Sequence, residues 1–249
     1  MKTYGIMQGR LSPPEDGRFQ SFPRNSWRDE IARAREAGLD YIEWIFDEYG
    51  RTANPIETPE GIAELNTLKA QHKISTPALC GDWLMDFPLL RCTESERAAR
   101  EAVLHRLLHK AAQIGATRMV LPFVDISKIE TDLNPADFAA LIARIPHPMV
   151  KVNYDSGNSS GLGYVAHEEF AAYGDRIGSI HIKDRYRKPG GGVETRPLGK
   201  GSADFDDVFA CMKKINYSAG VTMQVARGAD GDEVSFTKQQ LAFIKQYWQ

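Results

Sequence analysis

Residues 149–185, MVKVNYDSGNSSGLGYVAHEEFAAYGDRIGSIHIKDR, predict a β-strand, a helix and a second β-strand in succession. Met149–Tyr154 and Ile177–Ile182 are short apolar or β-branched runs, and Glu168–Tyr173 between them has apolar residues at helical spacing. Strands that alternate with helices form a parallel sheet that the helices cover. This stretch therefore predicts an α/β protein.

The same alternation runs along the rest of the chain. Further strands are predicted over Lys2–Gln8, Tyr41–Phe46, Ser75–Cys80, Arg118–Val124 and Gly220–Val225, with an eighth around Lys128–Leu133. Further helices are predicted from Ser26 to Gly38 and over Pro59–His72, Glu94–Gly115, Pro135–Arg144, Phe205–Ile215 and Ser235–Tyr247. Eight such units predict one TIM (β/α)8 barrel domain over residues 1–249, with its active site at the carboxyl ends of the strands. The alternative is an open doubly wound sheet, but no GxGxxG follows the first strand.

The alternation is irregular at one place. Only four residues separate Asp125 from Glu130, whereas a parallel crossover with its helix needs at least about ten to twelve. The sequence therefore predicts a barrel that is irregular or truncated around the fourth helix and fifth strand, unless residues are missing here.

The composition and charge of the chain disfavour nucleic acid and membranes as binding partners. The chain has 249 residues with 31 basic and 33 acidic side chains, a formal net charge of −2, so it has no general field for nucleic acid or an anionic membrane. No apolar stretch approaches the roughly 20 residues that span a bilayer. Three cysteines without a CxxC pair favour a cytoplasmic protein with reduced thiols.

Four polar side chains fall at or near the ends of predicted strands. They are Glu130, Asp155, His181 and Gln224. Two carboxylates, an imidazole and an amide oxygen suit a divalent ion such as Mn²⁺, Co²⁺ or Mg²⁺ better than a closed structural zinc site. Three of them also have an ordinary structural role open to them: a solvated loop residue or helix cap for Glu130, a turn for Asp155 and a hydrogen-bonded core histidine for His181.

The segment 181–201 is rich in basic residues and glycine. It begins with Lys183, Asp184 and Arg185 and continues through three consecutive glycines, Gly190–Gly192. Arginine beside flexible backbone can hold an anionic or polyhydroxylated ligand, although a solvated mobile loop is the other interpretation. Arg10, Glu43–Asp47 and Gly81–Trp83 follow earlier strands and indicate a sugar pocket or ordinary barrel packing.

Taken together, these motifs resemble the sugar phosphate isomerase/epimerase family of xylose isomerase-like barrels. The resemblance rests on GIMQGRLSP, IEWIFD, VLPFVD, ETDL, VNYDSGNS, HIKDR, PLGKGSADF and QVAR, and spans nearly the whole chain. Ketose-phosphate 3-epimerases and hexulose-6-phosphate isomerase-like proteins are the most similar groups within it.

The resemblance implies a barrel that holds one divalent metal ion (Mn²⁺, Co²⁺, Mg²⁺ or Zn²⁺) through a Glu, an Asp, a His and a second Glu. The first three fall on Glu130, Asp155 and His181, while the fourth falls on Gln224, which can ligate but cannot accept a proton. The residues expected to bind substrate are Arg185, Lys183, Glu43, Asp82 and Arg227.

The reaction that the resemblance implies is proton transfer next to the carbonyl of a ketose. The metal stabilises an enediolate and Glu130 moves the proton. Because Gln224 cannot be the second base, a 3-epimerase needs another donor, and a one-base aldose–ketose isomerase is the alternative. Two other hypotheses are an inactive sugar or sugar-phosphate binding barrel and, less favoured with only six histidines, an endonuclease IV-like nuclease. Family members are often dimers or tetramers, so the sequence is compatible with a homo-oligomer.

Overall fold

The computed structural model describes residues 2–122 and 133–249. The chain divides into two compact units. Among the described residues, the N-terminal unit comprises 5–122 and 228–237, and the C-terminal unit comprises 2–4, 133–227 and 238–249.

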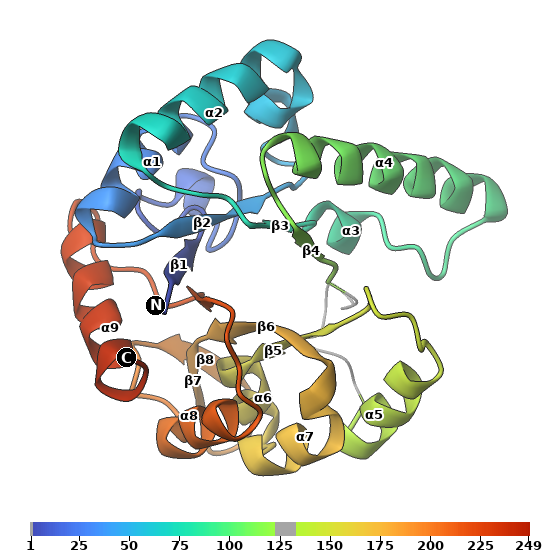
Figure 1. Ribbon diagram of the computed structural model, residues 1–249, viewed down its shortest axis with the longest axis vertical. Helices are drawn as coiled ribbons and strands as arrows, with labels where there is room; N and C mark the ends of the chain where they lie inside the picture. Colours follow the sequence, from blue (N-terminus) through green and yellow to red (C-terminus); the bar gives the residue numbers. More distant parts are fainter. Residues whose placement is uncertain (1, 123–132) are drawn as a thin grey trace. The chain divides into compact units, whose positions relative to one another are not determined.

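The N-terminal unit is built on parallel strands in the order β4-β3-β2-β1. Their bounds are Tyr4–Met7 for β1, Tyr41–Ile45 for β2, Ala78–Cys80 for β3 and Arg118–Val120 for β4. Helices α1 (Trp27–Glu36) and α2 (Pro59–His72) lie outside these strands, as Figure 1 shows, followed by α3 (Trp83–Asp86) and α4 (Glu94–Gln113). All five residues of β2 are buried, which is expected of a parallel strand covered on both faces.

Local signals in the sequence fix the helix starts of this unit. The Thr58 hydroxyl accepts a hydrogen bond from Gly61 N at 3.0 Å, and Pro59 takes the first position of α2, where its missing N–H costs nothing. Thr93 and Glu96 form a reciprocal capping box at the start of α4. These caps explain why the predicted and observed starts of both helices coincide.

The C-terminal unit contains parallel strands in the order β9-β6-β5. Their bounds are Val152–Asp155 for β5, Ile177–Ile182 for β6 and Val221–Met223 for β9. The helices of this unit are α5 (Pro135–Ala143), α6 (Ser156–Leu162), α7 (Ala166–Tyr173) and α8 (Phe205–Lys214), while α9 (Glu233–Tyr247) has residues in both units. Rings of α8 and α9 pack together, with Phe209 and Tyr247 stacked at 5.1 Å between centroids.

Residues 181–201 include a β-hairpin. Two antiparallel strands, β7 (Asp184–Arg187) and β8 (Val193–Arg196), form a hairpin within this segment. Gly190, Gly191 and Gly192 between them have φ of 89°, 103° and 81°, a region that residues with a Cβ rarely adopt. The glycines therefore serve the turn of a hairpin that the sequence does not predict.

The other predicted elements compare as follows. The seven strands outside residues 128–133 and the predicted helices are confirmed, with ends that differ by a few residues, whereas α3 and α6 were not predicted. The predicted irregularity and eighth strand fall on residues 123–132, outside the described residues, apart from Leu133. The single domain remains a prediction. None of the described helices is long and apolar enough to cross a membrane.

Candidate active site

Asp155 ends β5 with its carboxylate held in place by the backbone that follows. Its Oδ1 accepts hydrogen bonds from Gly157 N at 3.0 Å and Asn158 N at 2.9 Å, which caps the start of α6. The other oxygen, Oδ2, lies 3.9 Å from His181 Nδ1 and 3.9 Å from Lys183 Nζ. Oδ1 therefore caps the turn into α6, while Oδ2 faces the side chains of His181 and Lys183.

His181 lies directly opposite Asp155 in the register of β5 and β6. The neighbouring residues Ile180 and Ile182 are fully buried, and alternation along the strand places them on the opposite face from His181. Asn153 Nδ2 lies 3.3 Å from His181 Nδ1, and Asn153 Oδ1 accepts a hydrogen bond from Ser179 at 2.6 Å. An amide NH₂ group can only donate, so in this orientation Nδ1 of His181 is the acceptor.

Lys183 follows β6 and is only 3% exposed. Its Nζ donates a hydrogen bond to Gln224 Oε1 at 2.9 Å. Gln224 is brought there by the parallel pairing of β6 with β9, because its own N–H donates to Ile182 O at 3.0 Å. Asp155, His181, Lys183 and Gln224 thus meet at the carboxyl ends of three neighbouring strands.

The two arginines predicted to bind substrate also belong to the C-terminal unit. Arg185 is a half-buried residue of β7, and its carbonyl accepts a hydrogen bond from Ser202 N at 2.8 Å. Arg227 is half-buried three residues after Gln224. The predicted base and ligand Glu130 lies outside the described residues.

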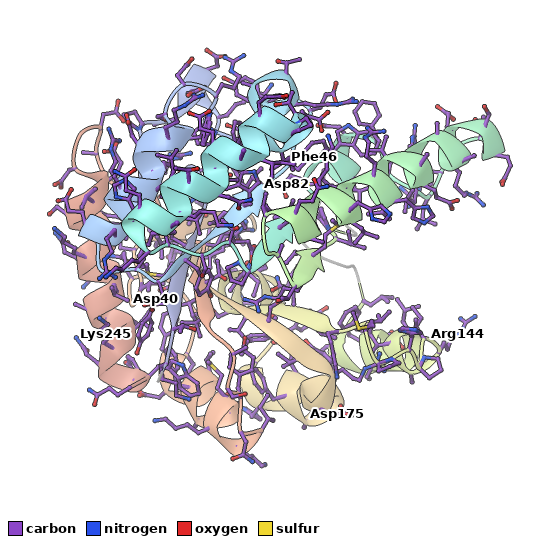
Figure 2. All side chains as sticks on the ribbon, turned by 45° about the horizontal axis from the view of Figure 1, so that its top comes forward. Asp40, Phe46, Asp82, Arg144, Asp175 and Lys245 are labelled. Atoms are coloured by element: carbon purple, nitrogen blue, oxygen red, sulfur yellow. The ribbon has the colours of Figure 1, made fainter. Side chains whose placement is uncertain are left out.

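The predicted pocket carboxylates of the N-terminal unit are both buried. Glu43 is fully buried in β2, opposite Met7 of β1. Figure 2 shows Asp82 beside Phe46, with Asp40 at the other end of β2. Asp82 accepts hydrogen bonds from Gln20 Nε2 at 2.7 Å and from the Cys80 thiol at 3.1 Å. Burial raises the pKa of Asp82, against the lowering effect of these two donors.

The sequence analysis does not identify two polar residues of these clusters, Asn153 and Gln20. Asn153 is two residues before Asp155, so strand alternation could have placed it on the same face. Gln20 lies in the long segment after β1, where no periodic signal is present, and its Oε1 accepts from Arg10 at 3.1 Å.

Metal donors are sparse among the residues that the structure describes. Within residues 2–122 and 133–249, no three His, Cys, Asp or Glu side chains form a group that could hold a metal ion. The pair Asp155 and His181 supplies two such donors, and Gln224 supplies an amide oxygen.

Comparison with known proteins places this chain among barrels of one kind. The sequence profile of the xylose isomerase-like TIM barrel matches residues 123–247, half of the chain. The chain belongs to the xylose isomerase-like TIM barrel family. The predicted fold class and the resemblance are therefore confirmed.

Relatives of this xylose isomerase-like barrel cover nearly the same length. A Haemophilus influenzae protein named "Putative L-ribulose-5-phosphate 3-epimerase SgbU" is 21% identical, with 83% of this chain and 86% of the relative covered. A structure of L-ribulose 3-epimerase matches with a TM-score of 0.72 at 14% identity, covering 99% of this chain and 94% of the other. A structure of IOLI protein with a bound zinc atom also has a TM-score of 0.72 at 14% identity, covering 99% of each chain. At these identities the solved structures establish the TIM-barrel fold.

Proposed function

We propose that this barrel is a sugar isomerase or epimerase that moves a proton next to the carbonyl group of a ketose through an enediolate. The observation that carries the proposal is the buried group formed by Asp155, His181, Lys183 and Gln224 at the carboxyl ends of β5, β6 and β9. Catalytic residues of TIM barrels lie at this end of the strands. The names of the epimerase relatives support the same class of reaction.

The proposed substrate is a small ketose or ketose phosphate. Lys183 and Arg185 supply N–H donors that suit hydroxyl, carbonyl or phosphate oxygens, and Arg227 is a third cation of the same unit. The carboxylate of Asp155 is an acceptor for sugar hydroxyl groups. Glu43 and Asp82, in the N-terminal unit, stay predicted substrate-binding residues. The homo-oligomeric state and the cytoplasmic location remain predictions.

The proton in this proposal is moved by one base. Glu130 remains the predicted base, since the resemblance places it there and the described residues do not include it. Gln224 cannot accept a proton, because its amide is neutral and its oxygen is not basic. This favours one-base aldose–ketose isomerisation, unless a second group protonates the opposite face of the enediolate.

A divalent metal ion is the cofactor that the resemblance implies, and a zinc-bound structure shares the fold. When bound, such an ion polarises a carbonyl oxygen as a Lewis acid. The described side chains fit it only in part. Asp155 Oδ2 is a suitable donor, but Gln224 Oε1 accepts from Lys183 and His181 Nδ1 faces an amide N–H₂ group. The amide oxygen of Gln224 is thus engaged by an ammonium group of the protein, which does not match the expected metal site.

A sugar-binding barrel without catalysis is the second candidate function. It is favoured by Gln224, which stands where the family carries a carboxylate able to transfer protons. Such a protein would bind ketoses and leave their carbon-bound protons in place.

Product formation from a panel of pentulose phosphates, hexulose phosphates and free ketoses tests the proposal. Wild type is expected to convert at least one of them to an epimer or an aldose, seen by NMR, and His181→Asn is expected to slow the conversion. The control is His105→Asn, an exposed histidine on α4. Saturable binding without any product would favour the binding barrel over the enzyme.

A further inference from the structure

The charge of the C-terminal cluster differs from that of the expected metal site. The resemblance expects a carboxylate at position 224, and this chain has a neutral amide there. A buried lysine, Lys183, donates to that amide at 2.9 Å and lies 3.9 Å from Asp155 Oδ2. The cluster therefore has one fewer negative charge than expected and contains a cation of its own.

We infer that the ammonium group of Lys183 takes the place of the divalent metal ion in this site and stabilises the enediolate oxygen. The inference rests on the proposed function for its chemistry, whereas the exclusion of the metal stands on the contacts alone.

Lys183 is held firmly by its surroundings. Ser156 Oγ accepts from Lys183 N at 3.0 Å and donates to Lys183 O at 2.7 Å, so one side chain fixes both backbone groups. Gly157 leaves no room beside the lysine stem, because a Cβ at that position would come within 2.7 Å of Lys183 Cγ and 2.9 Å of Cβ. A cation fixed in this way is preorganised, which is what electrostatic stabilisation of a developing charge requires.

The position of Nζ conflicts with a metal bound to Gln224. The Nζ lies 2.9 Å from Oε1, and a metal–oxygen bond is about 2.2 Å. An ion bound to that oxygen would therefore lie no more than about 5 Å from the ammonium, where burial leaves the repulsion poorly screened.

The chemistry balances without an added ion. A base takes the proton from the carbon next to the ketose carbonyl, and the electrons of the broken C–H bond form the C=C bond of the enediolate. The carbonyl oxygen gains the negative charge and accepts a hydrogen bond from the Lys183 ammonium, which keeps its proton. Return of the proton to the same carbon restores a ketose. Addition of a proton to the former carbonyl carbon, with transfer of the neighbouring hydroxyl proton to the former carbonyl oxygen, gives an aldose, so no oxidant or reductant is needed.

Metal retention tests this inference without reference to activity. Wild type, Lys183→Met and the double variant Lys183→Met with Gln224→Glu are incubated with Mn²⁺ or Zn²⁺, dialysed and subjected to elemental analysis, with Lys213→Met on the exposed face of α8 as control. Wild type and the control are expected to retain no stoichiometric metal. The double variant, which loses a positive charge and gains a carboxylate, is expected to retain it. One equivalent of metal in wild type that disappears in His181→Ala would overturn the inference.

Exchange of substrate protons with D₂O in the presence of EDTA gives the second readout. Chelation is expected to leave the wild-type rate unchanged, and Lys183→Met is expected to lower it about a hundredfold or more, as for the loss of one preorganised donor. Lys183→Arg, which keeps the charge, is expected to recover part of the rate. Loss of exchange on chelation, or a full rate in Lys183→Met, would contradict the role of Lys183. Absence of exchange in every wild-type assay would instead count against the proposed function, while metal retention still decides whether Lys183 excludes the ion.

Discussion

Asp155 on β5 and His181 on β6 are direct neighbours in a parallel register, and their side chains approach to 3.9 Å between Oδ2 and Nδ1. The pairing of these two strands thus brings together two residues 26 positions apart in the sequence and creates the centre of the proposed site. Lys183 follows His181 by two residues along the chain, and its Nζ lies 2.9 Å from Gln224 Oε1. Four predictions about the surroundings of this pair and about the rest of the fold can be checked directly.

The first prediction concerns the glycine that packs against Lys183. In Gly157→Ala the new Cβ would overlap the lysine stem, so we expect a loss of about 1–3 kcal/mol in the free energy of unfolding, typical of overpacking. Urea denaturation measures it. Gly81→Ala is the matched control, because its Cβ would meet no atom closer than 3.6 Å. Equal stability of the two variants would show that the lysine stem can move aside.

The second prediction concerns a buried carboxylate of the N-terminal unit. Glu30 on α1 accepts from Gly9 N at 2.8 Å, Leu11 N at 3.0 Å and Ser12 Oγ at 2.7 Å, and so fixes the segment after β1. Glu30→Ala leaves these donors without their acceptor and is expected to cost roughly 3 kcal/mol or more. The neighbouring exposed Asp29→Ala is expected to cost under about 1 kcal/mol, as for a surface ion pair. A similar melting temperature for both variants would refute the assigned role of Glu30.

The third prediction is a pH dependence of stability that originates at Asp82. Burial raises its pKa in the folded protein above the value of 3.8 usual for an aspartate. Between these two values the folded state binds more protons than the unfolded state, so the contribution of Asp82 to stability falls as pH rises through this window. The free energy of unfolding of wild type, measured relative to Asp82→Asn, is therefore expected to decrease from acidic to neutral pH. A difference that is constant with pH would contradict the raised pKa.

The fourth prediction concerns the contact between α7 and α8. His167 Nδ1 lies 2.8 Å from Asp207 Oδ2, and the hydrogen bond to Asp207 raises the pKa of this exposed histidine above 6.5. NMR titration of the imidazole is expected to show the raised pKa in wild type and a lower one in Asp207→Asn. Asp206→Asn, which changes the adjacent exposed carboxylate, is expected to have a smaller effect. An unchanged titration in Asp207→Asn would exclude the contact in solution.

The sequence predicts much of this fold because its elements carry local signals. Caps such as Thr58 and the capping box of Thr93 mark helix starts, and the apolar runs that form β2 and β6 mark buried strands. The hairpin of β7 and β8 was missed because its strands are rich in charged residues and do not alternate as a half-buried strand does.

The sequence predicts which residues lie at strand ends, but it does not predict which of their side chains contact one another. The strand-end positions of Asp155, His181 and Gln224 are predictable from the sequence, and the structure brings these three side chains into one cluster, while their role in a site stays a prediction. The hydrogen bond from Lys183 to Gln224 depends on the register between β6 and β9, and no local sequence pattern predicts that register. Gln20, which binds Asp82 across 62 positions of sequence, lacked any signal for the same reason.

The most direct test of the central claim is the incorporation of deuterium from D₂O into a ketose at the carbon next to its carbonyl group. NMR detects the label even when no net product accumulates, so the measurement isolates the proton transfer itself. The account predicts incorporation by wild type and a large loss of rate in Glu130→Gln and in Asp155→Asn. A ketose that binds to wild type without exchanging this proton would contradict the account and leave the sugar-binding barrel as the remaining function.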